Sequence, residues 1–106
     1  MLTFIETKLF TSLVRQYLSD DEYSALQQAL VARPDAGDVI RGSGGVRKIR
    51  WARAGGGKSC GVRVCYYTRT RAGQILMLVI YAKSVRDSIP SHILKALKEE
   101  MEHAQD

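Results

Sequence analysis

The chain has 106 residues, 45% of them hydrophobic and 25% charged, and a formal net charge of +5. This length predicts one domain with a single modest core. No apolar run reaches the roughly 18–20 residues of a membrane-spanning helix, and residues 1–6 lack the regions of a secretion signal. Together these features favour a cytoplasmic protein that does not insert into a membrane. Cys60 and Cys65 are too few for a disulfide framework, so we expect both to be free, structural thiols.

The first third of the chain predicts a strand followed by a helix hairpin. Residues 2–6 read as a short strand, and apolar residues then recur at helical spacing over residues 8–18. Ser19 and Glu22 form a capping box, which predicts the start of a second helix. That helix should run to about Arg33, because Pro34 ends it.

The next segments predict turns and two paired strands. Val39-Ile40 is a candidate edge segment, and the glycines at 42–45 and 55–57 indicate flexible hairpin loops and not phosphate-binding loops, because strands follow both. Residues 46–53 and 61–69 alternate between two faces. On the first of these strands, Trp51 is expected to pack under the helices.

The last third predicts a buried strand and a C-terminal helix. A hairpin turn at Ala72-Gly73 leads into the apolar run 74–82, which is typical of a central strand buried on both faces. Pro90 opens a helix with one apolar stripe, formed by Ile93, Leu94, Leu97 and Met101. The expected fold class is α+β: a helix hairpin packed on a mostly antiparallel sheet of about four strands with a C-terminal helix, in a single domain spanning residues 1–106.

Charge is distributed unevenly along this pattern. Residues 39–86 carry eleven basic side chains and no Asp or Glu, and both flanks are net acidic. Such a block repels itself, so it predicts an anionic partner, and spaced cations fit a phosphate backbone. The alternative is a solvated sheet face, although solvated surfaces usually mix both signs. The eleven cations are Arg41, Arg47, Lys48, Arg50, Arg53, Lys58, Arg63, Arg69, Arg71, Lys83 and Arg86.

Some of these cations are candidates for phosphate chemistry. Lys48 and Arg50 share one face of a strand, Arg63 lies on the next strand, and Lys83 follows the central strand. A lysine among other cations can act as a base near neutral pH, and arginine holds phosphate through two hydrogen bonds. Such a group could activate a ribose 2′-hydroxyl and stabilise charge on the phosphate without a metal. The remaining cations are expected to contact RNA or the ribosome: Arg41, Arg47, Arg53, Lys58, Arg69, Arg71 and Arg86.

Aromatic and other polar residues add weaker candidates. Tyr67 and Tyr81 could stack on bases, but strand tyrosines are more often core. His92 is a second candidate for a general acid or base, although its place in the first turn of a helix disfavours this role. No pair of Cys or His residues has zinc-ligand spacing, and nothing indicates a cofactor. The acids Glu99, Glu100 and Glu102 read as a solvated helix face.

Three segments together resemble the RelE/HigB superfamily of bacterial toxins, and its HigB-like branch in particular. They are the run 42–50 (GSGGVRKIR), the run 61–67 (GVRVCYY) and the run 80–84 (IYAKS), in that order. The helix hairpin around residues 17–23 and the stretch 34–40 also resemble this family. Any one of the three segments alone would be weak, whereas the three in this order are specific, and the resemblance as a whole covers nearly the whole chain.

The resemblance implies a microbial-ribonuclease-like fold and a ribosome-dependent endoribonuclease that cuts mRNA in the decoding site. It also implies a cognate helix-turn-helix antitoxin (HigA-like) that neutralises the toxin and carries it to operator DNA. Lys48 and Arg50 match the family's basic pair, Arg63 its phosphate-holding arginine, and Lys83 the lysine after its central strand. Ser84 and the pair Ile89-Pro90 depart from relatives that have an arginine and a terminal base there. The base is therefore open between Lys48 and His92, and a non-catalytic nucleic-acid-binding or regulatory subunit is the alternative.

Overall fold

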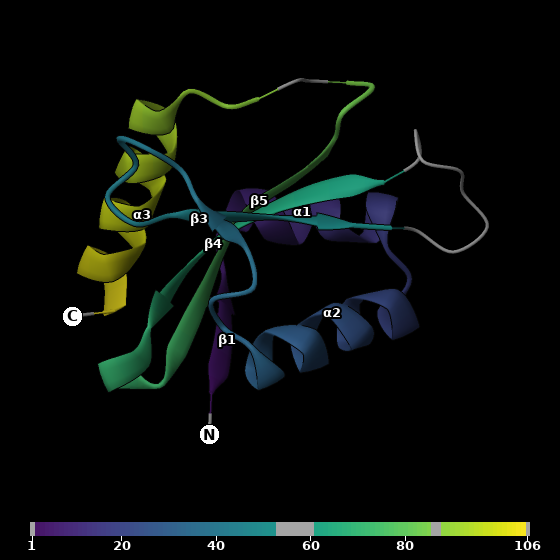
Figure 1. Ribbon diagram of the computed structural model, residues 1–106, viewed down its shortest axis with the longest axis horizontal. Coiled ribbons are helices and arrows are strands. Elements are labelled where there is room, and N and C mark those ends of the chain that lie inside the picture. The colour runs from purple at the N-terminus through teal and green to yellow at the C-terminus, as the bar shows by residue number, and fades with distance from the viewer. Residues whose placement is uncertain (1, 53–60, 86–87, 106) are drawn as a thin grey trace.

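A computed structural model describes residues 2–52, 61–85 and 88–105 (Figure 1). The predictions for Arg53, Lys58, Cys60 and Arg86, and for the glycines at 55–57, lie outside the described residues. The elements are β1 (Thr3–Glu6), α1 (Lys8–Tyr17), α2 (Asp20–Ala32), β2 (Asp38–Val39), β3 (Arg47–Trp51), β4 (Val62–Arg69), the 3-10 turn η2 (Thr70–Ala72), β5 (Gln74–Ala82) and α3 (Ser91–Gln105).

The strands form one sheet in the order β1-β5-β4-β3-β2. β1 pairs with β5 in parallel, and the other three pairings are antiparallel, so the predicted α+β class and mostly antiparallel sheet are confirmed. The described sheet has five strands and not about four, because Asp38 and Val39 pair with Lys48 and Arg47. The apolar strand β5 is internal and buried along nearly all of its length, as predicted.

The two N-terminal helices begin at well-formed caps. The Thr7 hydroxyl accepts a hydrogen bond from the Phe10 N–H at 2.9 Å and donates one to the Leu78 carbonyl at 2.7 Å, so it joins the start of α1 to β5. Ser19 and Glu22 form the predicted capping box at the start of α2. Such caps contribute about 1 kcal/mol each.

Helices cover both faces of the sheet, and each face has its own core. On the hairpin face, α1 and α2 bury Phe10, Val14, Leu18, Leu26 and Leu30 against Val62, Val64, Tyr66, Ile75, Met77 and Ile80, and Trp51 packs against this core as predicted. On the α3 face, Leu94 packs with Val46, Cys65, Leu76, Leu78, Val79 and Tyr81. Figure 1 shows α3 (yellow) set apart from α1 and α2 (purple to blue). The stripe on α3 was predicted wrongly in one position, because Ile93 is 43% exposed.

The glycine turn before β3, residues 41–45, is held by defined hydrogen bonds, whereas its composition indicates a flexible loop. Ser43 is fully buried, and its hydroxyl donates to the Ile40 carbonyl at 2.6 Å and accepts from the Val46 N–H at 3.0 Å. Gly44 has a φ of +76°, a conformation that favours glycine, and its carbonyl accepts a hydrogen bond from Lys98 Nζ of α3 at 3.1 Å. The turn therefore fixes where β3 begins relative to α3.

The β4–β5 connection is the predicted hairpin turn. The 3-10 turn η2 ends at Gly73, which has a left-handed φ of 66°. Among the described residues, no helix is both long and apolar enough to cross a membrane.

Candidate functional site

Three cations share the α3 face of strands β3 and β4. Arg50 is the cross-strand partner of Arg63, and Lys48 is the partner of Cys65, which belongs to the α3-face core. Because cross-strand partners project from the same face, the register brings together Lys48, Arg50 and Arg63, here called the cationic cluster. Arg50 is exposed, and Lys48 and Arg63 are half-buried.

The cationic cluster is electrostatically unbalanced. Like charges directly opposite each other on two strands destabilise a sheet, and Arg50 and Arg63 stand in this relation. Among the described residues, the ion pairs are Arg15–Asp20 and Lys98–Glu102, and neither involves the cluster. An anion bound between these side chains would relieve the repulsion, which makes the cluster a suitable phosphate site.

One carboxylate lies next to this cluster in the sheet. Asp38 on the edge strand β2 is the register partner of Lys48, although the two make no ion pair within 4.0 Å in the described structure. The acid-free segment of the sequence begins at the next residue, so the charge pattern alone missed this neighbour. Only the pairing of a two-residue strand reveals it.

A buried cysteine lies beside the lysine of the cationic cluster. Cys65 lies opposite Lys48 and is fully buried, and it is a free thiol, as predicted. Burial raises the pKa of Cys65 from 9.0 to about 12, and the positive charge of Lys48 opposes this shift. The thiol is therefore neutral at physiological pH and acts as a packing group beside the lysine.

Arg47 lies on the hairpin face, apart from the cationic cluster. Its guanidinium donates hydrogen bonds to the carbonyls of Gly37 at 2.8 Å and Asp35 at 3.3 Å. The Tyr66 hydroxyl accepts from the Gly37 N–H and donates to the Pro34 carbonyl, both at 2.8 Å. Together the two side chains hold the loop after α2 against the sheet, which gives Arg47 an anchoring role in the fold.

The other predicted cations are dispersed. Lys83 is exposed just after the end of β5, and Arg41 is exposed in the glycine turn. Arg69 and Arg71 lie at the far end of β4 and in η2, with Arg69 half-buried and Arg71 exposed. The cluster therefore occupies one end of β4, and a second pair of arginines occupies the other.

The predicted aromatic and histidine candidates differ in accessibility. Tyr81 is the register partner of Arg63 but is 5% exposed, so stacking on a base would require its ring to be uncovered. Tyr67 is half-buried, and Lys98 Nζ lies 4.7 Å from its ring centroid. His92 is exposed in the first turn of α3.

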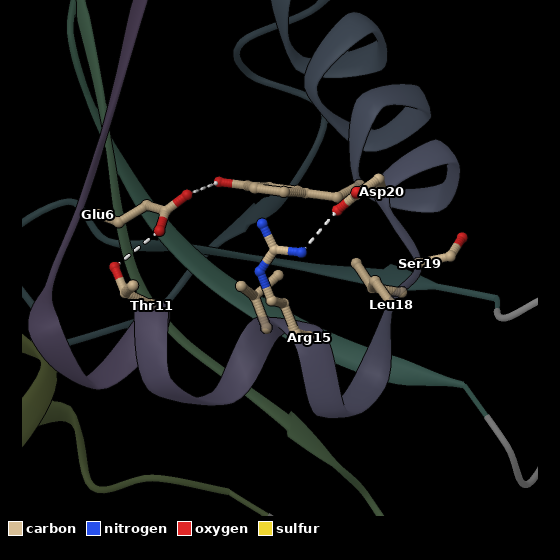
Figure 2. A pocket seen from close by; sticks show the side chains of 8 residues that line it. Glu6, Thr11, Arg15, Leu18, Ser19 and Asp20 are labelled. Atoms are coloured by element: carbon tan, nitrogen blue, oxygen red, sulfur yellow. Dashed lines mark hydrogen bonds and ion pairs between the residues drawn. The ribbon is translucent and has the colours of Figure 1, made fainter.

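A small pocket lies on the opposite side of the molecule, where β1, α1 and α2 meet (Figure 2). The Glu6 carboxylate accepts hydrogen bonds from Thr11 and from the Tyr23 hydroxyl, both at 2.7 Å. Burial, followed by the nearby Glu6 carboxylate, raises the pKa of Tyr23. The exposed pair Arg15–Asp20 lies beside it at 3.1 Å. These groups already satisfy one another, so the pocket joins three elements and offers little to a substrate.

A larger pocket of about 330 Å³ lies at the β4–β5 turn. It is lined by residues 67–72 and by Glu102 from α3. Glu102 is half-buried and lies 3.5 Å from Lys98 Nζ, so the prediction of a purely solvated acidic face on α3 was wrong for this residue. In the described part of the chain, no group of three or more His, Cys, Asp or Glu side chains is placed to hold a metal ion.

Comparison with known proteins identifies the fold. No protein-family model matches the chain. Among solved structures, the chain is similar to the E. coli toxin RelE, in a mutant with two arginines replaced by alanine, in the free state. The TM-score is 0.57 at 16% sequence identity, over 81% of this chain and 87% of that chain. The fold is therefore RelE-like, as predicted, and an identity this low carries the likeness no further than the fold.

Proposed function

We propose that this protein is the toxin of a type II toxin–antitoxin pair, a HigB-like endoribonuclease that cuts mRNA on the ribosome and so inhibits translation. The observation that carries the proposal is the cationic cluster, in which Arg50 stands opposite Arg63 with Lys48 on the same face. The RelE-like fold supports it. Among the described residues no carboxylate forms an ion pair with this cluster, so its positive charge is available to stabilise the negative charge that grows on a phosphate during cleavage.

The residues of the cluster divide the chemistry between them. Attack of a ribose 2′-oxygen on the adjacent phosphorus breaks the bond to the 5′-oxygen, which takes up a proton from water as it leaves. During the attack, negative charge grows on the non-bridging oxygens. Arg50 and Arg63 hold and neutralise these oxygens through guanidinium hydrogen bonds. We assign to Lys83, which is exposed after β5, the neutralisation of charge on the leaving 5′-oxygen. No metal or cofactor enters this scheme.

The proton of the 2′-hydroxyl needs an acceptor. Lys48 is our first choice because it lies in the cluster, on the face of Arg50 and Arg63. His92 is the second choice, since histidine is the commonest general base but the first turn of α3 is not part of the cluster. The two assignments make different predictions for Lys48→Ala and His92→Ala.

The proposal extends to partners. A helix-turn-helix antitoxin of the HigA-like kind would neutralise the protein, and operator DNA would be reached only through that complex. The ribosome and its bound message are the target in the cytoplasm. Arg41, exposed in the glycine turn, and Arg71, exposed in η2, would contact ribosomal RNA.

The decisive experiment is cleavage on programmed ribosomes. Purified wild-type protein should cut mRNA in the decoding site, and its expression in cells should arrest growth with loss of intact message. Under the enzymatic role, Arg63→Ala and Lys48→Ala lose cleavage by at least about 100-fold while ribosome binding falls modestly. A folded wild-type protein that leaves growth and mRNA unchanged would exclude the enzymatic role.

A matched control separates catalysis from binding. Arg33→Ala removes an exposed cation after α2, outside the cluster, and should leave cleavage within about twofold of wild type. If instead every cationic variant weakens RNA binding equally and the wild type never cuts, the protein is a non-catalytic binding subunit. Removal of one phosphate-binding cation should then reduce the salt slope of binding by about one.

A further inference from the structure

The pocket at the β4–β5 turn has a composition that backbone contact with RNA does not explain. Two of its lining residues are arginines, Arg69 and Arg71, and another is the aromatic Tyr67. The wall also includes Glu102, whose carboxylate would repel a phosphate backbone. A site that only gripped phosphates would have no use for an acid in its wall.

The side chains around the pocket are held in place. Lys98 Nζ lies 3.5 Å from the Glu102 carboxylate and 4.7 Å from the centre of the Tyr67 ring. It also donates to the Gly44 carbonyl, and its side chain is only 12% exposed. At the other side, Arg69 donates to the Gln74 side-chain oxygen at 3.3 Å. The pocket wall therefore combines a fixed carboxylate, a fixed ring and a braced guanidinium.

These groups match one nucleobase better than the others. Guanine has two acceptors, O6 and N7, and a donor amine, N2. Arginine pairs with O6 and N7 of guanine, and a carboxylate accepts from a base amine. Lys98 occupies part of the acceptor capacity of Glu102, and a carboxylate has about four acceptor positions in all. Adenine, cytosine and uracil each satisfy only part of this set.

We propose that this pocket is a guanine-binding site for single-stranded RNA, with Glu102 and Arg71 reading the base and Tyr67 and Arg69 forming its wall. The site rests on the proposed function and deepens it by giving an RNA cleaver a base-reading position. It is remote from the chemistry, because Arg63 and Arg69 lie six residues apart on β4, which is about 20 Å in a strand. The volume of about 330 Å³ lies within the usual range for small-molecule sites.

The sign of the Glu102→Gln effect tests the proposal. Fluorescent uridine octamers carrying one central guanosine or one central adenosine serve as probes, with binding followed by anisotropy. The wild type should prefer the guanosine probe by about 10-fold, since a good polar base contact discriminates by one to two orders of magnitude. Glu102→Gln should abolish that preference and weaken binding of the guanosine probe. If only charge matters, the same change tightens both probes, and the proposal fails.

Two controls protect this interpretation. Glu99→Gln removes an equal charge from an exposed position on the same helix and should keep the guanosine preference. Because Glu102→Gln also breaks the pair with Lys98, its thermal unfolding is compared with that of Lys98→Met. Lys98→Met loses the same pair, together with the Gly44 hydrogen bond and the contact with the Tyr67 ring, but keeps the carboxylate, so it should retain at least half of the discrimination. Equal loss in both variants would assign the effect to structure and overturn the base contact.

A measurement without catalysis separates this site from the proposed function. Titration of the wild type with guanosine or adenosine monophosphate, followed by NMR, should shift Tyr67, Arg71 and Glu102 with guanosine only. Such shifts in a protein that cuts no mRNA would keep the site and remove the endonuclease role. Cleavage of mRNA without such shifts would keep the endonuclease role and remove the guanine site. Vacant ribosomes distinguish the source: weaker binding of Glu102→Gln to them indicates a ribosomal guanine, and unchanged binding indicates one in the message.

Discussion

The two faces of strand β3 show opposite treatments of the same kind of side chain. On the hairpin face, Arg47 has two backbone carbonyls as acceptors, and Tyr66 completes the contact with the loop after α2. On the α3 face, Lys48 and Arg50 gain no such acceptors from the described part of the chain, and Arg50 meets Arg63 across the strand pair. The positive charge on the hairpin face is thus bound by backbone carbonyls, whereas the described residues offer no such partners to Lys48 and Arg50 on the α3 face.

This difference shows that a run of cations in sequence is not one functional unit. Strand alternation divides neighbours between a face that anchors a loop and a face that can hold an anion. Residues that the fold has already satisfied should govern stability, and residues that it has left unbalanced should govern activity. The following predictions test this division.

The largest expected effect is on cleavage. Arg63→Ala should lower mRNA cleavage on programmed ribosomes by at least about 100-fold, because one transition-state donor is removed. Its thermal unfolding should be unchanged or slightly improved, since the repulsion with Arg50 disappears. Cleavage rates and calorimetry on the same preparation check both. A large loss of stability with normal cleavage would reverse the roles of the two faces.

On the hairpin face the expected effect is on stability. Tyr66→Phe removes the hydroxyl that bonds both Gly37 and Pro34, and should lower the free energy of unfolding by about 1–3 kcal/mol. Urea denaturation measures the change. Cleavage per folded molecule should be retained, and its loss would connect the hairpin face to the chemistry.

A pH titration tests whether the Cys65 thiol beside the cationic cluster is shielded from water. The pKa of Cys65 is raised from 9.0 to about 12 by burial, so its contribution to stability is complete below pH 9 and is lost as the pH rises toward 12. Relative to pH 8, the free energy of unfolding should fall by about 1.4 kcal/mol at pH 10 from this thiol. Denaturation of Cys65→Ala over the same range should show a flatter slope. Identical slopes would mean that water reaches the thiol.

The smallest expected effect concerns the carboxylate opposite the cluster. Asp38→Asn should change the free energy of unfolding by less than about 1 kcal/mol, because the pairing with Lys48 is at an exposed edge. RNA binding should tighten by a few-fold at low salt, as one repulsive charge is gone. Asp35→Asn, in the loop before β2, is the control and should do less. Equal effects would mean that the register with Lys48 is irrelevant.

The long, strongly patterned elements were predictable from the sequence. An apolar run indicated β5, the capping box at Ser19 and Glu22 indicated α2, and the alternation in β3 and β4 assigned Trp51 and Lys48 to opposite faces. These features depend on local periodicity, which the sequence contains directly. The three cations of the cluster were found for the same reason.

What the sequence did not reveal depends on pairing and on single hydrogen bonds. The edge segment expected at Val39-Ile40 is present as β2 one residue earlier, but no periodicity marks so short a strand, and only its register places Asp38 beside Lys48. The glycine turn is ordered by the buried Ser43 hydroxyl, which composition cannot indicate. Glu102 joined a pocket because α3 ends beside the β4–β5 turn, a tertiary contact with no sequence signal.

The parallel pairing of β1 with β5 has a consequence for how the molecule assembles. Residues 3–6 find their partners at residues 74–77, and Thr7 bonds to Leu78 across 71 positions of the chain. Contacts of such long sequence separation slow folding, because a large loop must close first. During synthesis, β1 must wait until residues 74–78 have left the ribosome. With the proposed action on ribosomes, the protein would remain unfolded, and harmless to the ribosome making it, until that segment has emerged.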